Sequence, residues 1–353
     1  MAAAKPSSRN HRRGRGTLER VERDILVCPV WVHRFAVVTA GATLVLIFVG
    51  ALVTSTGSGL AVPDWPLSFG QVFPPMVGGV LFEHGHRLVA AFVGLLTVTL
   101  LVLLTQWEPR IWVRWLARGA VLAVLLQGVL GGVTVLLRLP LLVSVTHACL
   151  AQAFLCLVVT LAVCTAPGWQ ARPAGEVEQA QPALWVLATI TAGIVYLQLI
   201  LGALMRHMGA GLAIPDFPLA FGRLLPPLDS SAVVVHFVHR LGALAVTLCV
   251  GWTIARVLSQ YRVERRLLRP ALLLGGLVLL QLTLGALTIW TRRAVLPMTA
   301  HVVVGAAVLA TSVVIALRAA RRTAALAAVP GQGWRDCVGA GPESPFLSVQ
   351  VTT

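Results

Sequence analysis

The sequence predicts an all-α integral membrane protein whose eight transmembrane helices form two four-helix bundles. Of its 353 residues, 57% are hydrophobic and only 12% are charged, whereas about a quarter of the residues in a soluble domain carry a charge. Eight apolar runs are long enough to cross a hydrocarbon core, which takes roughly 20 residues per helix. The second half of the chain also repeats motifs of the first half, which predicts two similar bundles.

The eight predicted spans lie near residues 35–55, 86–107, 115–137, 141–165, 184–205, 233–257, 268–290 and 295–317. The first span does not read as a cleaved signal peptide, because a long polar and basic segment precedes it and no small-residue cleavage site follows it.

Most of the positive charge lies on one side of the predicted membrane. The net charge is +15, and its arginines and lysine gather before the first span, between spans two and three, between spans six and seven, and after span eight. This is the positive-inside pattern. It predicts a multi-pass protein of the bacterial cytoplasmic (inner) membrane with both termini in the cytoplasm. It also favours lipid over nucleic acid as the partner of these charges.

The repeat is clearest in a proline-rich loop. GSGLAVPDWPLSFGQVFPP begins at Gly57 and GAGLAIPDFPLAFGRLLPP begins at Gly209, with 12 of 19 paired residues identical. Because four helices separate the copies, both halves enter the membrane in the same direction. This predicts a parallel repeat with a pseudo-two-fold axis along the membrane normal.

Five segments follow from this organisation. We expect a basic cytoplasmic tail (1–33), an N-terminal bundle (34–165), a cytoplasmic linker (166–183), a C-terminal bundle (184–320) and a disordered cytoplasmic tail (321–353).

The residues of the repeated loop are predicted to have mainly structural roles. Prolines keep it from forming a helix, Asp64 and Asp216 are typical turn residues, and Trp65 suits a membrane-interface belt. The six cysteines read as small apolar filler, because none lies in an outer loop where a disulfide would persist.

Four histidines stand out near the outer ends of the even-numbered spans: His86, His147, His239 and His301. His86 matches His239, and His147 matches His301, across the repeat. A single such histidine is explained equally well by a hydrogen bond between helices. Four at matching positions of the two halves indicate a functional site. Neutral imidazole suits iron, and haem iron is commonly held by histidine. A zinc site lacks a third ligand in each half, and a proton relay lacks acidic residues that continue across the midplane.

Neighbouring polar residues suggest more specific roles. Glu83 stands three residues before His86, on one helix face, whereas the matching position before His239 is His236. This asymmetry suggests that one site does chemistry while the other holds or passes electrons. Arg87 and Arg240 are expected either to bind haem propionates or to reach lipid headgroups. Three glutamines that each precede a glycine by four residues, Gln127, Gln198 and Gln281, indicate helix packing.

With these residues together, the chain resembles the haem A synthase family over roughly residues 33–320. The resemblance rests on GALVTSTGSGL at 50–60, Glu83-x-x-His86-Arg87, Thr146-His147, His239-Arg240 and Ala300-His301. Many bacterial members carry a cysteine pair in an outer loop, which this chain lacks, so we expect it to belong to a cysteine-free branch.

The resemblance implies a membrane oxidoreductase that oxidises a methyl group of haem O stepwise to a formyl group, giving haem A. It implies haem b held by His239 and His301, and substrate haem received by His86 and His147 with Glu83 as the carboxylate needed for turnover. It also implies haem O synthase and the cytochrome oxidase assembly machinery as partners. The oligomeric state stays open, a homo-oligomer included.

Two other functions compete with this reading. A di-haem b-type electron-transfer cytochrome explains the histidines but not the exchange of Glu83 for His236. A transporter with parallel repeats would place polar groups at the midplane, where these helices are apolar.

Overall fold

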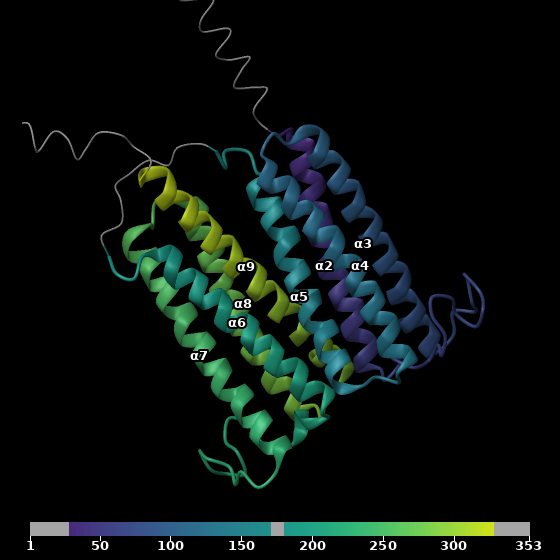
Figure 1. Ribbon diagram of the computed structural model, residues 1–353. Helices are drawn as coiled ribbons and strands as arrows, with labels where there is room; N and C mark the ends of the chain where they lie inside the picture. The colour runs from purple at the N-terminus through teal and green to yellow at the C-terminus, as the bar shows by residue number, and fades with distance from the viewer. Residues whose placement is uncertain (1–27, 171–179, 328–353) are drawn as a thin grey trace, which may run out of the picture.

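The structure is a computed structural model in which residues 28–170 and 180–327 are described. In these ranges the chain is helical, and eight helices are long and apolar enough to cross a membrane (Figure 1). They are α2 (Val30–Ser55), α3 (Gly79–Trp107), α4 (Ile111–Leu136), α5 (Leu141–Cys164), α6 (Leu184–His207), α7 (Ser231–Gln260), α8 (Arg265–Trp290) and α9 (Val295–Ala327). A short 3-10 helix, η1 (Ala210–Leu212), follows α6. The predicted number and order of spans are confirmed.

Several helices extend beyond the predicted apolar runs. α3 begins at Gly79 rather than near His86, because the polar residues that end the apolar run are themselves compatible with a helix. α9 continues to Ala327, through alanines and arginines that favour helix. The expectation of a disordered tail from residue 321 is therefore wrong for 321–327. The rest of that tail, and most of the N-terminal tail, lie outside the described residues.

The helices form two four-helix groups, α2–α5 and α6–α9, which lie side by side in Figure 1. Each group has its own buried core. One centres on residues such as Val93, Leu100 and Leu155, and the other on residues such as Val250, Leu274 and Leu309. Contacts of α2 and α5 with α9, and of α5 with α6, join the groups. Residues at this junction can therefore contact helices of both groups.

The long loops after α2 and α6 leave the helices at the same end of the molecule (Figure 1). Each loop is closed by an aspartate near its start. Asp64 accepts hydrogen bonds from the amides of Phe69 (2.8 Å) and Gly70 (2.9 Å), and Asp216 accepts the matching pair from Phe221 and Gly222. These bonds, first from Gly70 and then from Phe69, hold the pKa of Asp64 below its usual value. The turn role expected for both aspartates is confirmed.

The described cysteines are structural. Cys28, Cys149, Cys156, Cys164 and Cys249 are all free thiols. Burial raises the pKa of Cys28, which precedes α2, to about 12, so this thiol stays protonated and unreactive at neutral pH. The reading as apolar filler holds for these five, and Cys337 lies outside the described residues.

Candidate functional site

The four histidines occupy equivalent depths in the two halves. They lie in α3, α5, α7 and α9, six to eight residues after the first residue of each helix. At 1.5 Å per residue this is roughly 9–12 Å from the helix start. Their side chains are only partly exposed. The four histidines therefore lie at about the same depth near one end of the two helix groups, as expected.

Each imidazole packs against a glycine of a neighbouring helix. A methyl group at Gly50 would lie 2.9 Å from Cε1 of His86, and one at Gly202 would lie 3.1 Å from Cε1 of His239. Gly131 and Gly285 stand in the same relation to His147 and His301, each at 3.2 Å. Carbon atoms pack well at about 3.5–4.0 Å, so any larger residue would displace the ring. The four glycines thus set where the imidazoles lie.

Three glutamines add polar contacts to this packing. The side-chain amide of Gln127 donates to the carbonyl of His147 (2.9 Å), and that of Gln198 donates to the carbonyl (2.8 Å) and Nδ1 (3.1 Å) of His239. Gln281 donates to Nε2 of His301 (3.3 Å). The predicted packing role is confirmed, and the glutamines also touch the candidate ligand residues. The position in α2 that corresponds to Gln198 is Leu46, so His86 alone lacks such a neighbour.

The second-half pair brings two imidazole rings together with an angle of 65° between their planes. The ring centroids of His239 and His301 are 6.5 Å apart. Two imidazoles that share one metal through bonds of about 2 Å, the length known for zinc, need centroids roughly 6 Å apart. The Nδ1–H of His301 donates to the carbonyl of Gln281 (3.1 Å), which places the lone pair on Nε2, where a metal would take the place of the Gln281 amide. A backbone bond of this kind commonly orients a ligand histidine.

The imidazoles of the first-half pair, His86 and His147, have fewer hydrogen-bond partners within the protein. Nδ1 of His86 and Nδ1 of His147 are buried without a hydrogen-bond partner. Within the described ranges, no three or more His, Cys, Asp or Glu residues gather as a metal site. Paired neutral imidazoles without further protein ligands fit haem iron better than a tetrahedral zinc site.

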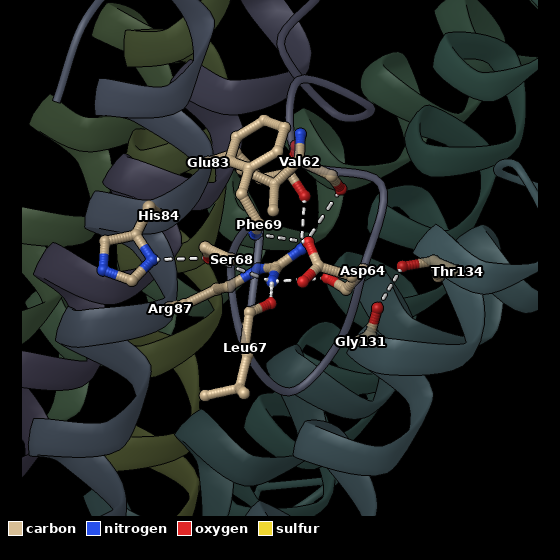
Figure 2. Close-up of polar contacts among 10 residues, drawn as sticks. All are labelled: Val62, Asp64, Leu67, Ser68, Phe69, Glu83, His84, Arg87, Gly131 and Thr134. Carbon is tan, nitrogen blue, oxygen red and sulfur yellow. Dashed lines mark hydrogen bonds and ion pairs between the residues drawn. The ribbon is translucent and has the colours of Figure 1, made fainter. Parts of the chain in front are cut away.

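Glu83 joins α3 to the loop above it (Figure 2). Its Oε2 accepts from the amide of Val62 (2.9 Å) and its Oε1 from Nη2 of Arg87 (2.7 Å), and the residue is only 4% exposed. In the second half Nδ1 of His236 accepts from the amide of Ile214 (3.2 Å). The exchanged residues therefore support the loop in the same way, but only the first half buries a carboxylate there.

Arg87 and Arg240 hold their loops rather than reaching outward. Nη1 of Arg87 donates to the carbonyls of Asp64 (2.8 Å) and Leu67 (2.9 Å), as Figure 2 shows. Arg240 donates to the carbonyls of Asp216 (2.6 Å) and Leu219 (2.8 Å). The expected roles of these arginines in propionate binding or headgroup contact stay predictions. Both guanidinium groups are committed to loop carbonyls that the sequence pattern alone could not pair with them.

Two further polar residues of this region were given no functional role from the sequence. His84 is 6% exposed, and its Nδ1 is hydrogen-bonded to Oγ of Ser68 (2.8 Å). The second half has Phe237 and Ala220 at these positions, packed in a small apolar cluster. Arg206, near the end of α6, bonds to the first half. The sequence feature that could have drawn attention to Arg206 is its position. An arginine at the outer end of a span differs from the positive-inside pattern that most charges of the chain follow.

The glycine contacts allow a direct test. Gly285→Ala is expected to displace His301 and weaken haem binding roughly 10- to 100-fold, the cost of losing a supporting partner of a metal ligand. Gly276→Ala is the matched control, because Gly276 lies in the same helix with nothing within 4 Å of an added Cβ. Haem titration of the two purified variants, followed by absorbance, gives the comparison. Equal affinities would show that the glycine does not set the position of His301.

The fold and the candidate site together define a protein with eight membrane-capable helices and four histidines at equivalent levels in two helical halves. Residues 78–313 match the COX15-CtaA family, described as cytochrome oxidase assembly protein, and the chain belongs to this family.

Relatives from several bacteria match most of the chain. A protein of Symbiobacterium thermophilum named "Heme A synthase" is 38% identical over 240 residues, covering 64% of this chain and 76% of the relative. Proteins of the same name from Shouchella clausii and Alkalihalophilus pseudofirmus are 31% and 29% identical, each covering 74% of this chain and 88% of the relative. The family expected from the sequence motifs is confirmed.

Proposed function

We propose that this protein is a haem A synthase, a membrane oxidoreductase that oxidises a methyl group of haem O stepwise to the formyl group of haem A. The family match and the relatives named "Heme A synthase" support this function. The observation that carries the assignment of roles to the two halves is the exchange of Glu83 for His236. Only the first half buries a carboxylate beside its histidine pair.

The two halves divide the work in this proposal. His86 and His147, in the N-terminal bundle (34–165), receive the substrate haem, and their unpartnered buried Nδ1 atoms favour a site completed by a ligand. His239 and His301, in the C-terminal bundle (184–320), hold haem b, and the 6.5 Å between their ring centroids supports a shared iron. Haem b supplies one-electron redox chemistry when bound, which lets electrons leave the substrate.

In this proposal Glu83 is the side chain that exchanges a proton with the substrate. Glu83 is buried and bonded to Arg87 and Val62, so it is held in place at the first-half site. A carboxylate there can take a proton from the substrate edge or stabilise positive charge that develops on it. Glu83 and Arg87 also fasten the loop that follows α2 to α3.

The setting of the enzyme is part of the proposal. Eight membrane-capable helices and bacterial relatives make it a multi-pass bacterial membrane protein. The positive-inside pattern supports a place in the cytoplasmic membrane with both termini in the cytoplasm. The sequence has no cysteine in either outer loop, which supports a mechanism that does not depend on thiols, as in a cysteine-free branch. Haem O synthase and the cytochrome oxidase assembly machinery are the proposed partners.

Co-expression with a haem O synthase tests the function. Haems extracted from the purified protein are separated and identified by mass. The proposal expects haem b together with haem O, its hydroxylated intermediates or haem A. Two identical b haems and no conversion of haem O would instead indicate a di-haem electron-transfer cytochrome, and the absence of any haem would favour a transporter.

A further inference from the structure

Arg206 of α6 reaches across the junction between the two halves. Its Nη2 donates to the carbonyl of Ala51 (2.8 Å) and to Oγ of Ser55 (2.7 Å), both in α2. Ser55 also accepts from Oγ1 of Thr299 in α9 (2.8 Å). One hydrogen-bonded group thus joins three helices from both halves.

The charge of Arg206 is not balanced by the protein. Its Nε is buried without a hydrogen-bond partner, and its other partners are neutral oxygens. Among the described residues, no carboxylate forms an ion pair with it. A guanidinium that is partly buried without a counter-charge is costly. The arrangement therefore favours an anionic ligand.

The place of Arg206 identifies which anion is available. Thr299, which shares Ser55 with Arg206, stands two residues before His301. Ala51, whose carbonyl accepts from Arg206, directly follows Gly50, the glycine against which His86 packs. Arg206 is therefore linked through its partners to a histidine of each half. A haem brings two carboxylates, its propionates, to such a place.

Other arginines near the histidines are less suitable for this role. Arg87 is paired with Glu83 and donates through both terminal nitrogens to loop carbonyls. Arg240 also donates through both terminal nitrogens to loop carbonyls. The Nε of Arg240 is buried without a partner, as that of Arg206 is, but its guanidinium is held against the loop that carries Asp216. The first-half position that corresponds to Arg206 is Thr54, so the cation belongs to one site only. The second half holds the residue, and His301 is the ligand beside it.

We propose that Arg206 binds a propionate carboxylate of the haem held by His239 and His301, through its unpaired Nε. This inference rests on the proposed function, because it takes that haem to be present. It adds a binding residue that joins the cofactor to the first-half helix α2 through Ser55. Arginine is suited to carboxylates because its planar fork donates several N–H bonds.

A haem without free carboxylates separates binding from folding. Full-length protein with His147→Ala, so that only the second-half pair remains, is purified from haem-depleted cells and titrated with haem b or with its dimethyl ester. Arg206→Gln is expected to weaken binding of haem b roughly 10- to 100-fold, the worth of a charge-assisted hydrogen bond. It should leave the affinity for the ester nearly unchanged. Arg138→Gln, at an exposed arginine of the first half, is the control and should alter neither.

Each other outcome overturns the inference. Equal weakening for both haems would make Arg206 a structural residue of the helix junction, and unchanged binding of haem b would leave it no role at the site. If haem O is converted normally while Arg206→Gln binds haem b like the parent protein, only this inference fails. If the parent protein binds no haem, the proposed function fails with it.

Discussion

Replacing His301 with alanine is expected to remove the resident haem b from the purified protein. His301 loses no other essential contact in this change, since its bonds are to Gln281 alone. An iron ligand is worth more than its supporting partners, whose loss already costs 10- to 100-fold in affinity. We therefore expect haem b binding to fall by at least about 100-fold. His239→Ala should behave in the same way, because its ring is the other member of the pair.

The measurement is the haem b content per protein, determined from the pyridine haemochrome spectrum. His147→Ala should keep its haem b, because it belongs to the first-half pair. His33→Ala is a further control, since His33 bonds to the carbonyl of Ala162 at the other end of the helices (3.0 Å). Full haem b content in the His301→Ala protein, or its loss in the His33→Ala protein, would contradict the division between the halves.

Glu83→Gln is expected to stop product formation while leaving both haems bound. The glutamine can still accept from the amide of Val62, so the loop keeps one of its two contacts with this side chain. It can neither take up a proton nor balance the charge of Arg87, which the carboxylate contacts at 2.7 Å. Loss of a general acid or base typically costs about 10²- to 10⁴-fold in rate, and we expect a fall in haem A formation of this size.

The matched control is His236→Gln, at the corresponding position of the second half. His236 also accepts from a loop amide, so this variant tests whether disturbance of a loop anchor is enough to stop turnover. We expect haem A formation to continue in this protein. Mass analysis of extracted haems gives both results. Normal conversion by the Glu83→Gln protein would remove the carboxylate from the mechanism, and accumulation of haem O would support it.

The sequence was sufficient for features that depend on composition and spacing. Hydropathy predicts the eight spans, and the repeat pairs His86 with His239 and His147 with His301. The turn role of Asp64 also followed from local chemistry, because the side chain bonds to amides five and six residues later. Such contacts are close along the chain, and patterns of spacing report them well.

Features that depend on contacts between distant segments were not predictable. Arg87 stands beside a histidine in the sequence, but its partners are loop carbonyls about 20 residues away. The bonds of Arg206 cross more than 150 residues. The start of α3 was placed too late, because a hydropathy run ends at polar residues that a helix can still include. Only the packed arrangement shows which donors are already used and which are left without a partner.

The central claim is that two pairs of histidines hold two haems, one pair in each half. The most direct measurement is the Soret absorbance of the purified protein beside that of a variant in which all four histidines, His86, His147, His239 and His301, are alanine. The account predicts a strong Soret band in the first protein and none in the second. A parent protein without the band, or a fourfold variant that keeps it undiminished, would contradict the account.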